Sequence, residues 1–213
     1  LLSVEDLSLR GAVSSIRGIE RLRNLRALAI IGIRSTLNDI SPLADLFRLR
    51  EISIFNTELT SLRGLLRLRL LRRLRLDRNR IKDLTPLAQL TLVTELTLSS
   101  NQIQDVFPLR LMRRLQKINL NDNQIRDLSH LAKLINLEEI NFNNNQVASL
   151  DFVVRLEKLR VLNFNNNLIE DLSPLLALPA LVRISLQRNL LSAQAREDAR
   201  QLVENGVQVI GRL

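Results

Sequence analysis

From residue 79 to residue 189, an asparagine returns every 22 residues. Each one closes a run of the form L-x-x-L-x-L-x-x-N, and the same register extends backwards to runs that begin at Leu49, Leu25 and Val4. All steps between units are 22 residues except the first two, which are 21 and 24. A fixed period of about 20 to 50 residues is typical of repeat proteins, whose units bury a core only when they stack. The pattern therefore predicts about nine strand units in one register.

Each unit reads as a strand followed by a turn. In "LRRLRLDRN", residues 71–79, leucines alternate with polar residues, as in a strand with one buried face. In the following "DLTPLAQL", we expect Thr or Ser to cap a short helical turn and Pro to occupy its first position. The three-residue spacing of Leu84, Leu87 and Leu90 predicts a 3-10 turn with these side chains inward. The recurrent Asp, here Asp83, is expected to accept hydrogen bonds from amides just ahead of that turn.

The recurrent asparagine needs an explanation, because Asn is a poor strand and core residue. Its side-chain amide can bond backbone groups of neighbouring turns. Stacked once per unit, such amides would form a ladder that satisfies loop backbone otherwise left unpaired. The predicted structural ladder comprises Asn79, Asn101, Asn123, Asn145, Asn167 and Asn189.

These units resemble the leucine-rich repeat family over essentially the whole chain. The 22-residue form with "DLSPL", residues 171–175, is similar to the bacterial internalins and to the regulatory-subunit type that binds protein phosphatase 1. The resemblance implies an α/β fold, a curved solenoid with a parallel β-sheet on the concave face and short 3-10 turns on the convex face. We expect residues 1–191 to form the repeats.

Residues 192–213 break the repeat and predict a C-terminal cap of one helix and a short strand. Ser192 can cap the helix, and Asn205 with Gly206 can end it before the strand-like "VQVI". The face that would pack on the last repeat comprises Ala195, Ala199, Leu202 and Val203. A partner-binding amphipathic helix is the alternative interpretation of this segment.

The residues between the leucines predict the partner-binding face. We expect an apolar patch that includes Ile31 and an exposed Phe55, because aromatic and Arg anchors are enriched at binding hot spots. Next to it the register places Arg73, Arg75, Asp77 and Arg78. The C-terminal half of the face would be lined by amides, namely Asn119, Asn141, Asn143, Asn163 and Asn165. Those amides have a structural alternative, since Asn side chains on adjacent strands can bond one another along a sheet.

The register also sorts the charges. The net charge is +9, carried by 27 Arg and four Lys, so an acidic partner or nucleic acid comes into question. Basic residues gather just before the strands, namely Arg21, Arg23, Arg26, Arg48, Arg50, Arg67, Arg69, Arg72, Arg113, Arg114, Lys158 and Arg160. The loops after the strands hold Asp39, Asp83, Asp105, Asp127 and Asp171. We therefore predict a basic flank and an acidic flank.

The sequence lacks the residue combinations that catalytic sites usually need. The single histidine, His130, occupies the column of Pro42, Pro86 and Pro174, and the chain has no cysteine. Nucleophile–base pairs and zinc sites therefore have no ligand set, and the glycines form no phosphate-binding motif. We predict no enzyme activity, no metal and no cofactor. The lack of cysteine also excludes disulfides without determining the compartment.

The preferred hypothesis is a binding module that holds another protein on the concave face and the basic flank. Three alternatives stay open: a nucleic-acid or ribonucleoprotein component, the recognition segment of a larger effector or signalling protein, and an engineered scaffold. Nucleic acid is disfavoured because the chain has no Trp or Tyr to stack on bases. The resemblance implies adhesion to a host receptor or docking on a phosphatase catalytic subunit.

We expect a monomer without membrane insertion, because no apolar run reaches the length of a membrane span. A cytoplasmic location is favoured. A secreted or surface-attached protein is the alternative, since the chain begins at Leu1 and a leader could precede it.

Overall fold

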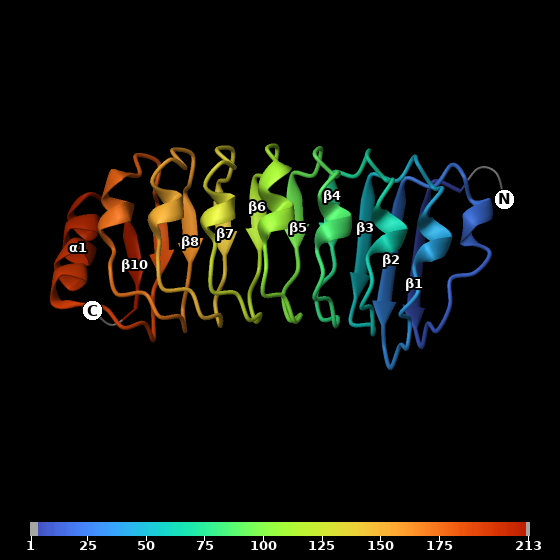
Figure 1. Cartoon of the computed structure of the whole chain (residues 1–213), viewed down its shortest axis with the longest axis horizontal. Helices are drawn as coiled ribbons and strands as arrows, with labels where there is room; N and C mark the ends of the chain where they lie inside the picture. The colour runs from blue at the N-terminus through green and yellow to red at the C-terminus, as the bar shows by residue number, and fades with distance from the viewer. Residues whose placement is uncertain (1–3, 212–213) are drawn as a thin grey trace.

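Ten parallel strands pair in chain order to form one open sheet (Figure 1). The computed structural model describes residues 4–211, so the outermost residues of the predicted segments 1–191 and 192–213 lie outside it. The strands are β1 (Asp6–Gly11), β2 (Ala27–Gly32), β3 (Glu51–Phe55), β4 (Arg73–Arg75), β5 (Glu95–Thr97), β6 (Lys117–Asn119), β7 (Glu139–Asn141), β8 (Val161–Asn163), β9 (Arg183–Ser185) and β10 (Gln208–Ile210).

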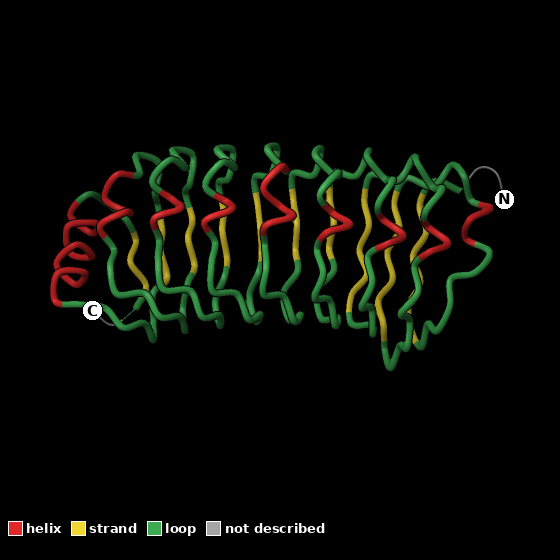
Figure 2. Tube along the Cα trace, viewed as in Figure 1, coloured by secondary structure: helices red, strands yellow, loops and turns green. Residues whose placement is uncertain are grey.

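A row of short 3-10 turns covers the opposite side of the solenoid from the sheet, and one helix closes its C-terminal end (Figure 2). The turns are η1 (Ile19–Arg21), η2 (Ser41–Leu43), η3 (Arg63–Leu65), η4 (Thr85–Leu87), η5 (Phe107–Leu111), η6 (Ser129–Leu131), η7 (Asp151–Val153) and η8 (Ser173–Ala177). The helix is α1 (Ala193–Glu204). The fold predicted from the repeat, a leucine-rich-repeat solenoid with a helical cap, is confirmed.

The strand register follows the sequence period. Asp6 lies opposite Ala27, and Ala27 lies opposite Glu51, so the irregular steps of 21 and 24 residues appear in the pairing itself. The extra residues project as a loop beyond the end of β2 (Figure 1). Gly32 is needed there, because a Cβ at this position would lie 2.0 Å from the carbonyl oxygen of Asn56.

Leucine and its relatives fill the space between the sheet and the turns. Leu84, Leu87 and Leu90 are all buried, as the three-residue spacing predicts. In the C-terminal half Phe142 and Phe164 replace leucine and stack with ring centroids 6.0 Å apart. Full burial of one such side chain is worth about 1.5–3 kcal/mol, so stability is shared along the stack and does not belong to any single unit.

The recurrent asparagines link each repeat to its neighbours through buried hydrogen bonds. Asn123 shows the pattern: its Nδ2 donates to the carbonyls of Leu98 at 3.0 Å, Leu120 at 3.1 Å and Asn121 at 3.0 Å. Its Oδ1 accepts the backbone N–H of Ile103 at 3.0 Å. One side chain therefore satisfies backbone groups in two successive loops, which water cannot reach.

The first repeats use hydroxyl side chains in the ladder column. Thr57 is buried, and its Oγ1 donates to Oδ1 of Asn79 at 2.6 Å. Ser35 is also buried and donates to the carbonyl of Val13 at 2.5 Å. A hydroxyl has one donor where an amide has two, so these repeats are cross-linked by fewer bonds than the later ones.

The residue before each ladder position has a left-handed backbone. The φ angles lie between 53° and 57° at Arg34, Asn56, Arg78, Ser100, Asp122, Asn144, Asn166 and Arg188. Asn and Asp tolerate this conformation better than other residues with a Cβ. This explains part of the asparagine run in "INFNNNQV", residues 140–147, where Asn144 adopts the left-handed turn and Asn145 occupies the ladder.

The helical turns are capped differently from the prediction. In η2, η4, η6 and η8 the Ser or Thr is the first residue of the turn, and a leucine or isoleucine stands at the N-cap without a side-chain bond. The Asp two residues ahead accepts the N–H of the first residue of the turn at 2.7–2.8 Å in five repeats. The predicted role of the recurrent Asp is therefore confirmed, whereas the Ser/Thr N-cap prediction is wrong. The aliphatic residue occupies the N-cap position because its side chain is buried in the core.

The C-terminal helix begins and ends where the sequence indicates. Ser192 Oγ accepts the N–H of Ala195 at 3.0 Å, and Asn205 is the C-cap. The predicted packing face is correct except at Val203, whose side chain is 51% exposed. Asp198 occupies that face instead, buried, with its Oδ1 accepting a bond from Gln194 at 2.9 Å.

Replacing Asn123 by Ala should lower the free energy of unfolding by about 2–4 kcal/mol, because several buried backbone groups lose their side-chain partner. Asn123→Asp keeps the acceptor but not the donors, so it should be at least as damaging. Gln124→Ala, at the exposed next residue, serves as the control and should cost less than about 0.5 kcal/mol. Urea denaturation measures all three, and an Asn123→Ala protein as stable as the control would contradict the ladder's role.

The Asp caps predict a loss of stability in acid. The N–H of Ser129, and then its hydroxyl, holds the pKa of Asp127 below its ordinary value, and Ser41 does the same for the pKa of Asp39. Because the folded pKa is depressed, the stabilisation is complete above about pH 4, the ordinary Asp value, and is lost as pH falls through the folded pKa. An Asp39→Asn, Asp127→Asn protein should melt lower than wild type at neutral pH and lose less on acidification. Thermal melts between about pH 3 and pH 7 test this, and equal pH dependence of the two proteins would refute it.

Candidate functional site

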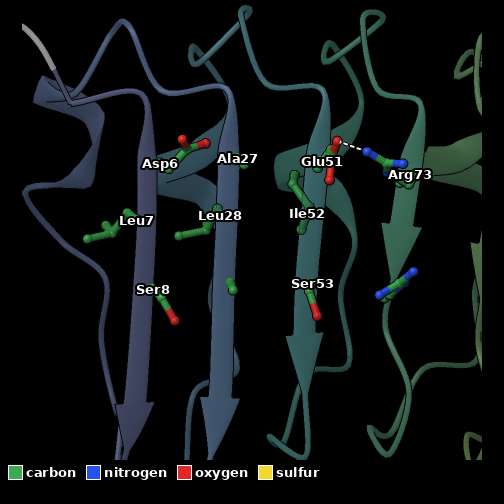
Figure 3. Close-up of a pocket in the computed structure, with 11 residues that line it drawn as sticks. Asp6, Leu7, Ser8, Ala27, Leu28, Glu51, Ile52, Ser53 and Arg73 are labelled. Atoms are coloured by element: carbon green, nitrogen blue, oxygen red, sulfur yellow. Dashed lines mark hydrogen bonds and ion pairs between the residues drawn. The ribbon is translucent and has the colours of Figure 1, made fainter.

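A hollow of about 610 Å³ lies on the sheet over β1, β2, β3 and β4 (Figure 3). Small side chains create it, since Ser8, Ala29 and Ser53 stand in the row that continues as Arg75. Charged groups of both signs line it as well, namely Asp6, Glu51, Arg73 and Arg75. An open hollow with convergent polar groups is the default binding-site candidate on such a surface.

Three rows of side chains run across the strands on this face. The first row contains Asp6, Ala27, Glu51, Arg73, Glu95, Lys117, Glu139, Val161 and Arg183. The second row contains Ser8, Ala29, Ser53, Arg75, Thr97, Asn119, Asn141, Asn163 and Ser185. The third row contains Arg10, Ile31, Phe55, Asp77, Ser99, Asn121, Asn143, Asn165 and Gln187.

The first row alternates in charge from β3 to β7, and two of its glutamates, Glu51 and Glu95, pair with the predicted arginines. Arg73 is hydrogen-bonded to Glu51, and this bond raises the pKa of the Arg73 guanidinium. Arg75 donates from Nη2 and Nε to Oε1 of Glu95 at 2.7 and 3.2 Å. Sequence reasoning missed Glu51 and Glu95, although each lies one period from Arg73. Both arginines are thus oriented by carboxylates rather than free.

The third row forms a second ladder, as the structural alternative for the amides implies, although most of its bonds go to backbone N–H groups. Oδ1 of Asn143 accepts the backbone N–H of Asn165 at 2.7 Å, and Oδ1 of Asn165 accepts that of Gln187 at 2.7 Å. Asp77 makes the same kind of bond separately, by accepting the N–H of Ser99 at 2.8 Å, whereas the N–H of Asn121, the next residue in the row, bonds to Asn119. These side chains stabilise the strand ends, so the structural alternative for the amides accounts for much of their hydrogen bonding.

The amides of the second row bond to one another and to nearby groups of their own strand. Asn163 Nδ2 donates to Oδ1 of Asn141, while Asn119 Oδ1 accepts the N–H of Asn121 at 3.0 Å. All three side chains remain half-exposed.

The predicted apolar patch is partly covered. Ile31 and Phe55 are neighbours across the β2–β3 pair, and both are half-buried. The guanidinium of Arg78 lies 5.3 Å from the centre of the Phe55 ring, a cation–π contact. The prediction of an exposed Phe55 is therefore wrong, because Arg78, whose left-handed backbone turns at the end of β4, shields the ring.

The charges of the two flanks do not separate as cleanly as the predicted basic flank and acidic flank. The strand-start flank is basic in the second to fourth repeats, where Arg26, Arg50 and Arg72 directly precede β2, β3 and β4. The strand-end flank is mixed, since Arg80 pairs with Glu58 at 2.8 Å and Lys82 stands beside Asp83 in the chain. His130 lies in η6 with its ring 5.0 Å from that of Phe107, away from the sheet face.

Comparison with known proteins identifies the family. Residues 91–133 and 113–155 match the family model described as leucine-rich repeats in two copies. An internalin C2 of Listeria monocytogenes is 32% identical, with a TM-score of 0.75 over 98% of this chain and 80% of that one. The chain belongs to the internalin-like leucine-rich repeat proteins.

Two further structures support the same fold. The internalin inlF of Listeria monocytogenes is 30% identical with a TM-score of 0.86, over 95% of this internalin-like chain and 60% of that chain. A leucine-rich repeat protein of Leptospira interrogans, 23% identical with a TM-score of 0.77, shares the fold over 98% of this chain and 60% of its own. The chain thus spans 60% of the length of both proteins. No curated protein sequence matches it.

Leucine-rich repeat proteins generally bind other proteins and generally have no enzyme activity. Within residues 4–211, no helix has the length and apolar character of a membrane span. Nor do three His, Asp or Glu side chains of that part of the chain come together as a metal-binding group.

The Arg75–Glu95 pair should be weakly stabilising. A double-mutant cycle with Arg75→Ala and Glu95→Ala should give a coupling energy below about 1 kcal/mol that shrinks in high salt, because the Arg75 side chain is 53% exposed. A large, salt-independent coupling would show that the pair supports the fold, and not chiefly the orientation of Arg75.

Proposed function

We propose that this internalin-like chain holds another protein on its sheet face, with the hollow over β1 to β4 as the centre of contact. The hollow itself is the main support for this proposal. The outward side chains there are as small as Ala29 and Ser53, and charged residues of both signs surround them. A partner's side chain can enter there without displacing any side chain of the sheet.

The chemistry around the hollow supports specific recognition. Arg73 and Arg75 are held by Glu51 and Glu95, so their remaining N–H donors point in defined directions. Arginine is among the residues enriched at binding hot spots, because its planar fork makes several directional bonds. Phe55 and Ile31 supply apolar area in the neighbouring row.

The two ladders make the C-terminal part of the face rigid. Backbone groups at the strand ends are bonded by Asn123-type side chains below and by Asn143-type side chains on the face. Binding to a rigid surface loses less conformational entropy, which favours affinity. We propose polar contacts at Asn119, Asn141, Asn143, Asn163 and Asn165, from groups the ladders leave unused, and contacts at Asp77 and Arg78 beside Phe55.

Binding rather than catalysis is the activity we propose, as is general for this family. The charged groups Arg73 and Glu51, and Arg75 and Glu95, pair with one another on this face, and such pairs hold position rather than activate a nucleophile.

Filling the hollow tests this proposal. Ala29→Arg places a long charged side chain in the middle of it, and Leu190→Arg adds the same charge in a loop where the wild-type side chain is 58% exposed. Immobilised wild type and both variants are incubated with extracts of the source organism and of cells it contacts, and captured proteins are quantified. Ala29→Arg should reduce the specific capture at least about tenfold, equivalent to about 1.4 kcal/mol, while Leu190→Arg leaves it unchanged. The same proteins captured at the same level by a folded Ala29→Arg variant would sink the proposal.

A further inference from the structure

The positive charge of this chain is confined to one part of it. Residues 17–80 contain 15 arginines, no lysine and six acidic residues, and so carry the whole net charge of +9. The rest of the chain has 16 basic and 16 acidic residues. A uniformly basic composition would not produce this division, so the charge reflects a local surface.

Several of these arginines are already neutralised by carboxylates of the chain. Arg26 pairs with Glu5 at 3.3 Å, and Arg67 pairs with Asp45 at 3.4 Å. Six exposed arginines at the strand-start flank form no ion pair within residues 4–211, and we call them the arginine edge: Arg21, Arg23, Arg48, Arg50, Arg69 and Arg72.

The fold places like charges side by side along this edge. The N–H of Arg50 donates to the carbonyl of Arg26, and the N–H of Arg72 donates to that of Arg50, both at 2.8 Å. The same column continues with Thr94 and Gln116, which are uncharged. Like charges on adjacent strands destabilise a sheet. The concentration of unpaired arginines such as Arg50 and Arg72 on neighbouring strands therefore costs stability, which a bound anion would restore.

The arginine edge is continuous with the proposed binding hollow. Arg72 on the edge directly precedes Arg73 in the hollow, at the start of β4. The arginines of the hollow already bind carboxylates, with Arg75 placing two donors on Glu95. Guanidinium groups of this surface thus suit carboxylates in geometry as well as in charge.

Nucleic acid fits this edge less well. Proteins that bind single strands stack bases on aromatic side chains, and the chain has no Trp or Tyr. Phe47 directly precedes Arg48 of the edge in the chain, and the guanidinium of Arg67 lies 5.1 Å from its ring centre. That ring is already taken by a cation–π contact of the chain itself.

We infer that the arginine edge binds an acidic polypeptide segment, presented by the same partner whose main contact lies in the hollow. The inference rests on the proposed function and adds the chemistry of the partner: a run of Asp and Glu that passes from the hollow over the start of β3 and β4. The edge arginines bind its carboxylates and relieve the repulsion among themselves.

A labelled peptide of about ten glutamates tests the edge directly by fluorescence anisotropy, at about 50 and 200 mM salt. The edge variant is Arg50→Gln, Arg72→Gln. Its matched control is Arg155→Gln, Arg160→Gln, because Arg160 holds the column of Arg50 and Arg72 in the eighth repeat. The edge variant should bind the peptide at least about fivefold more weakly than wild type, and the control less than about twofold, with both differences shrinking in salt. Equal binding by the edge variant and the control would overturn the inference.

Two further measurements separate loss of the edge contacts from unfolding and from a preference for a different polyanion. The edge variant should melt at or above the wild-type temperature, since it loses like-charge repulsion, so weaker binding cannot be ascribed to unfolding. An oligothymidine of ten nucleotides and vesicles with anionic lipid are measured in parallel. Tighter binding of either than of the peptide would overturn the assignment to an acidic polypeptide.

The results for the edge variant and for Ala29→Arg distinguish the inference about the arginine edge from the proposed function of the hollow. If Ala29→Arg abolishes partner capture while the edge variant keeps peptide and partner, the edge inference fails and the proposed function stands. If the edge variant loses the peptide while Ala29→Arg still captures the partner, the edge carries the binding and the hollow proposal fails.

Discussion

The buried asparagine amide is the interaction on which the rest of this structure depends. A solenoid turns its backbone twice per repeat, and each turn leaves N–H and C=O groups that no strand or helix pairs. An amide has two donors and an acceptor, so Asn123 can serve carbonyls in its own loop and the previous one while accepting the N–H of Ile103, which also lies in the previous loop. The 22-residue step is maintained because only this step brings the amide onto the same atoms in every repeat.

That constraint explains where the chain is free to vary. Repeats with a full amide ladder have three-residue strands and a sheet face whose third row is also committed to structure. In the first repeats the ladder column holds Ser35 and Thr57, the strands are longer, and two extra residues are accommodated after β2. The small side chains of the hollow and the surplus arginines occur in this same region. The most regular repeats thus lie at the C-terminal end of the stack, and the hollow and the surplus arginines lie at the N-terminal end.

Much of the fold was predictable from residue spacing, because each strand contacts only its sequence neighbours. The order of the strands, the irregular 21- and 24-residue steps, the buried leucines and the helix capped by Ser192 all follow from local pattern. The N-cap of the 3-10 turns did not, because Ser and Leu compete for that position and burial of the leucine decides. The prediction that Val203 packs on the last repeat was wrong for a related reason, since the helix face that packs there buries Asp198 instead.

The candidate site was likewise predictable in part. By itself the sequence determined which residues share a row on the sheet face, because period and alternation assign every side chain to a column. It did not determine which of them are available. Only the tertiary structure showed that Arg78 covers Phe55, that Glu51 and Glu95 hold Arg73 and Arg75, and that Asn143 and Asn165 are used in a second ladder. The physical reason is that a column fixes where a Cβ lies, whereas a long side chain reaches across several Å and selects its partner from all the neighbours there.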